Sequence, residues 1–378
     1  MTGSSRTRSG THGSVPVVDH AAALSDGSDV TRERVDAVLR VMRGNGAVPG
    51  DLHAVELEQL QGGFSRQIYR VVFASPNSEP KAVIVRVHQP GSLVEAGLDA
   101  EYRTYEALTG VGVPTPHLYG YEDDTDTPFG GGFFVMECLP GWPPNVWRSA
   151  DRDLLRADWE GPRRIADDLV RYLATIHTGD TSPVQRVVPH LGFTELVGRW
   201  QQLWERARLS RDPVVEDAYA WVLDRPPDPV PASLVHGDFR IGNCLVGDGV
   251  TGILDWEFTH VGDPRFDLGY LALEYNCGKF LSPGSDLLGA VAGRSWFWER
   301  YHELTGMVVD LEVVRTFSVV GALMLIANLT AGVRSYVDGQ ATDIRMLWGR
   351  LPVAGLRQDL VRLMRWPTAS DQAPALRT

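Results

Sequence analysis

Residues 234–257 read LVHGDFRIGNCLVGDGVTGILDWE, and this stretch decides which fold the chain adopts. Two glycines place Asp238 on a loop, and apolar residues on both sides of a Gly-Asp-Gly turn predict a β-hairpin after Asn243. We expect the hairpin to carry Asp255 back to the end of the ladder where Asn243 lies, beside Asp238. Two carboxylates and an amide oxygen that meet there can hold hard divalent cations against phosphate and leave one carboxylate to accept a proton. The stretch therefore predicts the active site of a phosphoryl-transfer enzyme.

The pattern His-Gly-Asp-x4-Asn followed by Asp-Trp-Glu resembles the aminoglycoside phosphotransferase and choline kinase-like group, which is distantly related to the protein kinases. The resemblance implies that Asp238 is the catalytic base, that Asn243 and Asp255 bind Mg2+, and that ATP is the phosphoryl donor. It also implies an α+β, protein-kinase-like fold with two lobes. The alternative is structural: Asp238 would cap a turn, and Asp255 would end a strand.

The composition limits the partners. A net charge of −12 argues against sequence-independent nucleic-acid binding, which needs a basic face, and is compatible with a cationic small-molecule acceptor. The most apolar segment, residues 317–329, is shorter than the ~20 residues of a membrane span, so we expect a buried helix and no membrane partner. Three cysteines without Cys-x-x-Cys spacing predict reduced thiols in a cytoplasmic protein.

The chain divides into a tail and two lobes. Residues 1–30 are rich in Ser, Gly, Thr and Arg and lack an apolar run, so we expect a disordered tail rather than a signal peptide. Residues 31–139 are expected to form a small nucleotide-binding lobe, an antiparallel sheet with one inserted helix. A Pro-Gly-Trp-Pro-Pro run opens the mostly helical catalytic and acceptor-binding lobe, residues 140–378.

Hydrophobic periodicity and turn residues give the expected elements of each lobe. The first lobe should contain helices 31–43 and 98–108 and strands 54–60, 68–73, 81–87, 117–121 and 133–138. The second should contain helices 161–177, 192–207, 214–223, 267–276, 295–304, 311–333 and 351–364.

The loop between the first two strands carries Gly62, Gly63 and Ser65, at the place where kinases cover the phosphates of ATP. Glycine lets backbone N–H groups approach an anion, and the serine adds a hydroxyl donor. The Gly-x-Gly-x-x-Gly pattern of protein kinases is absent, so the loop resembles the shorter hairpin of the aminoglycoside and choline kinase-like group. An ordinary hairpin turn is the alternative.

Val-Ile-Val-Arg, ending at Arg86, aligns with Val-Ala-Ile-Lys on the third strand of kinases. Arginine binds phosphate bidentately where lysine acts as a point charge. We expect Arg86 to contact the phosphates, with Lys81 as the second choice. Its acidic partner should be Glu101 on the following helix, and Glu95 and Glu106 are alternatives. Solvated charges at a sheet edge are the other interpretation.

The junction between the lobes resembles the kinase hinge. The resemblance implies that Glu137 offers its carbonyl group and Leu139 its N–H group to adenine, although any strand carries both groups.

The acceptor side is predicted from charges near the catalytic residues. Arg240 and Glu257 lie beside the catalytic and metal positions, and Glu274 lies on a later helix that could wall the cleft; each could instead be a solvated charge. His236 is expected to hold the loop, and Asp267 to cap a helix and anchor the loop.

The resemblance favours an aminoglycoside as acceptor. A choline or amino-alcohol kinase, a sugar kinase and a macrolide kinase are alternatives within the enzymes. The alternative from another class is a catalytically weak nucleotide-binding module that regulates a partner, and the intact set of Asp238, Asn243 and Asp255 argues against it.

Overall fold

The computed structural model describes residues 29–44, 46, 52–60, 66–75, 78–88, 97–157, 164–278 and 286–364. The N-terminal lobe contains an antiparallel five-stranded sheet with the order β1-β2-β3-β5-β4. Its strands are β1 (His53–Leu60), β2 (Arg66–Ser75), β3 (Ser78–His88), β4 (Leu118–Glu122) and β5 (Phe133–Glu137). Its helices are α1 (Asp29–Gly44) and α2 (Leu98–Leu108). The predicted α+β lobe is confirmed.

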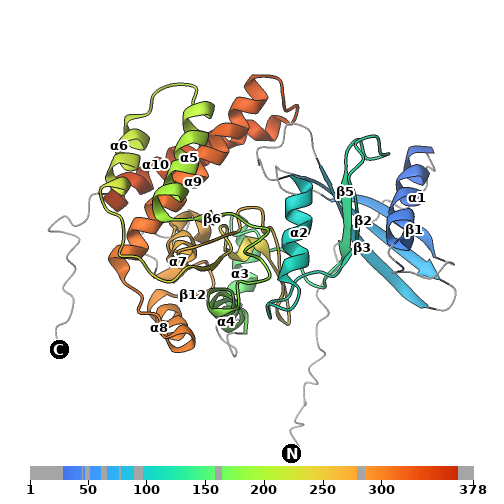
Figure 1. The fold of residues 1–378 in the computed structure, drawn as a ribbon, viewed down its shortest axis with the longest axis horizontal. Coiled ribbons are helices and arrows are strands. Elements are labelled where there is room, and N and C mark those ends of the chain that lie inside the picture. Colours follow the sequence, from blue (N-terminus) through green and yellow to red (C-terminus); the bar gives the residue numbers. More distant parts are fainter. Residues whose placement is uncertain are drawn as a thin grey trace, which may run out of the picture.

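The two faces of this sheet pack against different helices (Figure 1). Val83, Val85 and Val87 of β3 are fully buried in a core that they share with α1. Alternation along the strand sends Ile84 and Arg86 to the opposite face, where α2 lies between the sheet and the second lobe. Arg86 therefore points toward the junction of the lobes.

The second lobe is mainly helical. Its helices are α3 (Ser149–Ala157), α4 (Arg164–Thr178), α5 (Phe193–Ala207), α6 (Pro213–Leu223), α7 (Arg265–Leu271), α8 (Arg294–Thr305), α9 (Leu311–Val337) and α10 (Arg350–Met364). The 3-10 helices are η1 (Ile241–Asn243), η2 (Glu274–Cys277) and η3 (Ile344–Gly349). The short strands are β6 (His190–Leu191), β7 (Ser233–Val235), β8 (Cys244–Gly247), β9 (Gly249–Ile253), β10 (His260–Gly262), β11 (Leu287–Leu288) and β12 (Ala292–Gly293).

Helix α9 forms the centre of this lobe. It packs against α5, α7 and α10. By length and composition alone it could cross a membrane, but 72% of its most apolar window is buried inside the lobe, as in a core helix. One hydrophobic cluster joins the lobes, since Tyr105 of α2 and Phe134 of β5 pack with Ile253 and Trp256 beside the β8–β9 hairpin.

The structure corrects several expected boundaries. Residues 1–28 of the expected tail lie outside the described part of the chain, and α1 begins at Asp29. The helix expected at 267–276 is divided, because Leu273 has extended backbone angles (φ −61°, ψ 133°) that separate α7 from η2. Helix α7 begins at Arg265, so Asp267 lies inside it and does not cap it. Helix α3 and the sheet of β6, β10 and β7 were not predicted.

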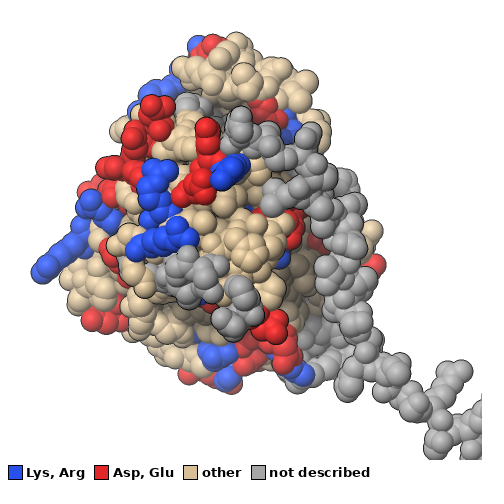
Figure 2. Space-filling view, turned by 90° about the vertical axis from the view of Figure 1, so that its right-hand side faces the viewer, with Lys and Arg blue, Asp and Glu red and all other residues tan. Residues whose placement is uncertain are grey.

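The outer face of the N-terminal lobe shows no gathering of one charge among the described residues. Figure 2 shows acidic and basic side chains interspersed there. Arg70 and Glu56, for example, pair at 3.2 Å between β2 and β1. This face therefore lacks the basic stripe that nucleic-acid binding requires.

Candidate active site

The loop that carries Asp238 is held by one buried carboxylate. Oδ1 of Asp267 accepts a hydrogen bond from the Gly237 N–H at 2.9 Å, and its Oδ2 accepts from the His236 N–H at 2.8 Å. Nε2 of His177, on α4, lies 3.1 Å from the same Oδ2. Burial alone would raise the pKa of Asp267, but these donors bring that pKa below its ordinary value. The anchoring role expected for this carboxylate is present.

Gly237 and His236 fix the shape of the loop. Gly237 has φ +87°, and a Cβ there would lie 2.4 Å from the carbonyl oxygen of Phe258, so only glycine fits. Nδ1 of His236 accepts from the Asp238 N–H at 3.2 Å, and its Nε2 lies 3.1 Å from the Leu254 carbonyl. Burial lowers the pKa of His236, so the ring is neutral and Nε2–H donates to that carbonyl. The predicted structural role of His236 is confirmed.

Asp238 and Asn243 face each other across this loop. Nδ2 of Asn243 donates to Oδ2 of Asp238 at 2.8 Å and to its carbonyl oxygen at 2.9 Å. After Asn243 the chain enters the β8–β9 hairpin, and the Leu254 N–H returns to donate to the Asn243 carbonyl at 2.8 Å. The predicted hairpin is confirmed, and it places Asp255 next to the loop that carries Asp238, residues 236–243.

Asp255 connects this hairpin to the N-terminal lobe. Its φ of +68° lies in the left-handed region, which costs a residue other than glycine about 1–3 kcal/mol. Its N–H donates to the Tyr105 hydroxyl of α2 at 3.1 Å, and its Oδ1 lies 3.2 Å from Nη2 of Arg86 on β3. The carboxylate thus lies where both lobes can contact one ligand.

A buried ion-pair network surrounds Glu101 of α2. Its Oε1 lies 2.8 Å from Nη2 of Arg86, and its Oε2 lies 3.2 Å from Nε of Arg66 at the start of β2. The Glu101 side chain is fully buried between the two arginines. Burial lowers the pKa of Arg86, but the carboxylates of Glu101 and Asp255 raise it to a net value above the ordinary one. Arg86 therefore stays charged.

Arg86 forms the expected ion pair with Glu101, while its contact with the phosphates stays a prediction. Arg86 reaches Glu101, whereas Lys81 lies on the other face of the sheet, with its Nζ 4.6 Å from the centre of the Tyr119 ring. Glu106 is exposed. Glu95 lies outside the described residues.

Sequence reasoning missed Arg66. It lies on β2, on which Ile68 pairs with Arg86 of β3. In the sequence Arg66 directly follows Ser65, and only Gly62, Gly63 and Ser65 of that loop were expected to contact the phosphates. Two-residue alternation from position 68 to position 66 places Arg66 on the same face as Arg86. That alternation was the signal that could have found it.

The expected phosphate loop and hinge stay predictions. Gly62, Gly63 and Ser65 lie outside the described residues. Glu137 ends β5, and its N–H donates to the His117 carbonyl at 2.8 Å. Within the described chain, no hydrogen bond from the Leu139 N–H is present, which leaves that donor open to a ligand.

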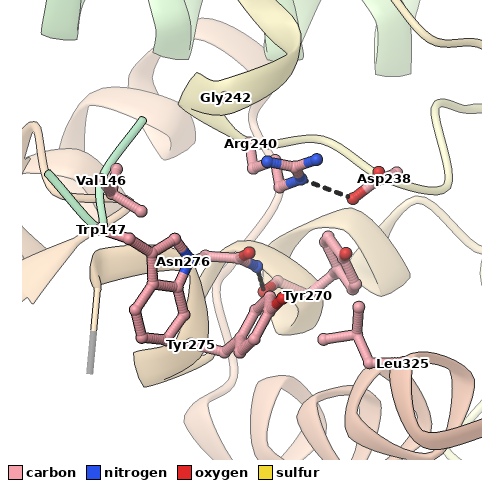
Figure 3. A pocket seen from close by; sticks show the side chains of 9 residues that line it. All are labelled: Val146, Trp147, Asp238, Arg240, Gly242, Tyr270, Tyr275, Asn276 and Leu325. Carbon is pink, nitrogen blue, oxygen red and sulfur yellow. Dashed lines mark hydrogen bonds and ion pairs between the residues drawn. The ribbon is translucent and has the colours of Figure 1, made fainter. Parts of the chain in front are cut away.

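A cavity of about 100 Å3 opens beside Asp238 on the side of the second lobe (Figure 3). Its walls come from the segment before α3, the loop that carries Asp238, α7, η2 and α9. The lining residues are Val146, Trp147, Asp238, Arg240, Gly242, Tyr270, Tyr275, Asn276 and Leu325. Asp238 therefore faces a cavity on this side of its loop.

Of the three residues expected to face the acceptor, only Arg240 lines this cavity. Its Nε lies 3.1 Å from Oδ1 of Asp238. Glu274 is half exposed and pairs with Arg362 at 2.9 Å, away from the lining. Glu257 is partly buried near Asp255 and Glu101 rather than at the cavity: burial first, and then the carboxylates of Asp255 and Glu101, raise its pKa well above the ordinary value.

Within the described residues, no group of three or more His, Cys, Asp or Glu side chains forms a cluster that could hold a metal. Any ion at this site would use the mixed oxygen set of Asn243 and Asp255.

A family model matches this chain over residues 56–304, which is more than half of its length and covers the site residues described above except Leu325 of α9. The model is that of the phosphotransferase enzyme family. The chain belongs to this family. The loop that carries Asp238 and the Arg86–Glu101 pair both lie inside the matched range.

Three curated relatives are similar to this phosphotransferase. Acyl-CoA dehydrogenase family member 10 of Mus musculus is 27% identical over 231 residues, which are 58% of this chain and 20% of that protein. Acyl-CoA dehydrogenase family member 11 of Homo sapiens is 28% identical over 201 residues, 51% of this chain and 25% of that protein. Viomycin phosphotransferase of Streptomyces vinaceus is 27% identical over 212 residues, 52% of this chain and 62% of that protein. The match thus spans a quarter or less of the two dehydrogenase relatives.

Solved structures share the fold. A presumed aminoglycoside phosphotransferase from Ralstonia eutropha has a TM-score of 0.65 at 20% identity, covering 89% of this chain and 98% of that one. A mutant aminoglycoside phosphotransferase with AMP-PNP and hygromycin B has a TM-score of 0.54 at 17% identity, covering 83% and 95%. A choline/ethanolamine kinase family protein from Mesorhizobium loti has a TM-score of 0.53 at 16% identity, covering 90% and 96%. The expected protein-kinase-like fold is confirmed.

Proposed function

We propose that this family member transfers the γ-phosphoryl group of ATP, with Mg2+, to a hydroxyl group of a small molecule. One observation carries the proposal: Asp238 lines a cavity on one side, while Asn243 and Asp255 connect it to the Arg86–Glu101 pair on the other. In the transfer, the acceptor oxygen bonds to the γ-phosphorus as the bond from that phosphorus to ADP breaks, and the hydroxyl proton passes to Asp238.

Asp238 is placed to serve as the base. Asn243 and Arg240 donate to different oxygens of its carboxylate, which fixes the plane of the group. A base held in position typically contributes about 10²–10⁴-fold to the rate. His236 is neutral but is engaged by the Leu254 carbonyl and the Asp238 N–H, so it takes no part in proton transfer.

The donor set fits a magnesium ion. Mg2+ prefers oxygen ligands and keeps several waters, so one or two protein ligands together with phosphate oxygens suffice. Asn243 and Asp255 would hold the ion, which when bound neutralises charge on the β- and γ-phosphates. Arg86, aligned by Glu101, would contact the phosphates. We assign Gly62, Gly63 and Ser65 to the phosphates, and the Glu137 carbonyl and Leu139 N–H to adenine.

The relatives support a nucleotide and a small-molecule acceptor. One solved neighbour holds AMP-PNP together with hygromycin B. An aminoglycoside acceptor stays a prediction for this chain, as do the choline, sugar and macrolide alternatives. The regulatory-module alternative is disfavoured, because such a module has no need of a base that lines a cavity.

We place this activity in the cytoplasm, where ATP is available. The three cysteines are free, and burial raises the pKa of Cys244 to about 12, which keeps that thiol protonated.

Nucleotide binding measured by calorimetry, with and without Mg2+, tests the metal assignment. Asp255→Asn should weaken binding of magnesium–ATP and leave binding of ATP in EDTA unchanged. The matched control is Asp248→Asn at the exposed tip of the hairpin. If magnesium strengthens ATP binding equally in both variants, Asp255 is not a metal ligand.

A further inference from the structure

The charge of the acceptor cavity does not suit a polycation. Among the nine lining residues that belong to the described part of the chain, Asp238 is the one carboxylate and Arg240 the one cation. Both oxygens of Asp238 already have partners, Arg240 at 3.1 Å and Asn243 at 2.8 Å. An acceptor with several ammonium groups would therefore lose hydration there without gaining counter-charges.

The lining is instead rich in hydrogen-bond donors. Arg240 donates through Nε to Asp238, and no described residue accepts a hydrogen bond from its two terminal nitrogens. Burial, then the charge of Asp238 and a side-chain hydrogen bond to that carboxylate, raise the pKa of the Tyr270 hydroxyl well above its ordinary value. Burial also raises the pKa of Tyr275, so both phenols stay protonated.

The rest of the lining is mostly apolar. The Trp147 and Tyr275 rings meet edge to face at 5.2 Å, and Leu325 of α9 lies across the cavity from the Trp147 side (Figure 3). Nδ2 of Asn276 donates to the Tyr270 carbonyl at 2.6 Å, which leaves its buried Oδ1 as one neutral acceptor. A bound molecule would contact the Arg240 guanidinium at one end and the apolar side chains of Trp147 and Leu325 at the other.

We propose that the acceptor is a short hydroxy acid. The terminal nitrogens of Arg240 bind its carboxylate, its hydroxyl group meets Asp238, and its carbon chain packs against Trp147 and Leu325. The planar fork of a guanidinium matches a carboxylate in a bidentate arrangement. Because Arg240 contacts Asp238 directly, the carboxylate and the reacting hydroxyl must be only a few bonds apart.

This inference rests on the proposed phosphoryl transfer and names its acceptor. The hydroxyl oxygen of the acid bonds to the γ-phosphorus, ADP leaves, and the proton passes to Asp238. The product is the phosphate ester of the acid, with the carboxylate unchanged.

The test compares each hydroxy acid with its uncharged methyl ester. ADP release is measured with lactate, β-hydroxybutyrate, γ-hydroxybutyrate and β-hydroxyoctanoate, with the methyl ester of each, and with choline and kanamycin. A charge-assisted hydrogen bond contributes about 1.5–3 kcal/mol, so at least one acid should exceed its ester roughly 10- to 100-fold in kcat/KM.

Variants of Arg240 test whether this residue causes the preference for the acid over its ester. Arg240→Gln should reduce the ratio of acid to ester to near one, and Arg240→Lys should keep part of it. The ratio is the readout because loss of the contact with Asp238 lowers turnover with both compounds. Arg300→Gln, which removes an arginine paired with Asp167 on the surface, is the matched control and should keep the ratio. Magnesium–ATP binding shows that each variant is folded.

Other outcomes overturn the inference. No stimulation by any acid, equal use of acids and esters, or preference for choline or kanamycin would each do so. If magnesium–ATP still binds and ADP release still depends on Asp238, the kinase proposal survives that result. Absence of magnesium–ATP binding would instead remove the proposed function itself.

Discussion

The loop around Asp238 takes its shape from hydrogen bonds to backbone groups, whereas the acceptor cavity beside it takes its shape from side chains of five separate segments. In the loop, Asp267 fixes two consecutive N–H groups, and the glycine conformation at Gly237 admits no other residue. In the cavity, Tyr270 and Leu325 come from helices far apart in sequence. The loop therefore tolerates little change, while the cavity wall can change acceptor without loss of the chemistry.

Removing the loop anchor should have the largest effect on stability. Asp267 accepts from the His236 N–H, the Gly237 N–H and Nε2 of His177. In Asp267→Asn an amide nitrogen replaces one accepting oxygen, so at least one of these donors loses its acceptor. Each unsatisfied buried group costs about 1–3 kcal/mol. The free energy of unfolding from urea titration should fall by about 3 kcal/mol, and activity should fall with every acceptor. Asp248→Asn, in the exposed turn, should leave both unchanged.

The pH dependence of this loss has a defined sign. The pKa of Asp267 is lowered in the folded protein, so its stabilising contribution is complete above the unfolded pKa of about 3.9 and is lost as pH falls through the folded value. The difference in unfolding free energy between wild type and Asp267→Asn should therefore shrink below about pH 4. If this difference in unfolding free energy grew as the pH fell, the role of Asp267 as the anchor of the loop would be contradicted.

On the nucleotide side, Glu101→Gln should have the next largest effect. It removes the carboxylate that pairs with both Arg66 and Arg86, so the affinity for magnesium–ATP should fall about 10- to 100-fold. Glu106→Gln, on the exposed face of the same helix, is the matched control. Calorimetry measures the affinity of both variants for magnesium–ATP. Equal affinities would show that Glu101 does not contribute to nucleotide binding.

A change in the cavity wall should have the smallest and most selective effect. Tyr270→Phe removes one donor and keeps the ring, so KM for the acceptor should rise about fivefold, as expected for one hydrogen bond of ~1 kcal/mol. The affinity for magnesium–ATP should not change. A parallel loss of nucleotide affinity would show that the wall and the nucleotide site are not independent.

The same difference explains what could be predicted from the sequence. Asp238 and Asn243 lie on the loop before the β8–β9 hairpin and Asp255 lies just after it, so local turn residues were enough to predict that the chain brings them together. The choice of Arg86 followed from the alignment of Val-Ile-Val-Arg with the third strand of kinases, and the observed pair with Glu101 agrees with it. These are properties of a short stretch of chain and need no knowledge of the tertiary fold.

The acceptor wall was not predicted, because it depends on the tertiary fold. Tyr275 and Asn276 reach the cavity only because the chain breaks at Leu273, inside a stretch whose periodicity predicts one continuous helix. Glu274 was expected at the acceptor for the same reason, and the break leaves it paired with Arg362 at the surface.

The central claim is that Asp238 accepts the proton from an acceptor hydroxyl, and Asp238→Asn tests it most directly. ADP release with the best compound of the acceptor panel should fall at least ~10²-fold, while calorimetry should give magnesium–ATP affinity near that of wild type. The Asp248→Asn protein should match wild type in both assays. Turnover of Asp238→Asn close to wild type, with nucleotide affinity intact, would contradict the account.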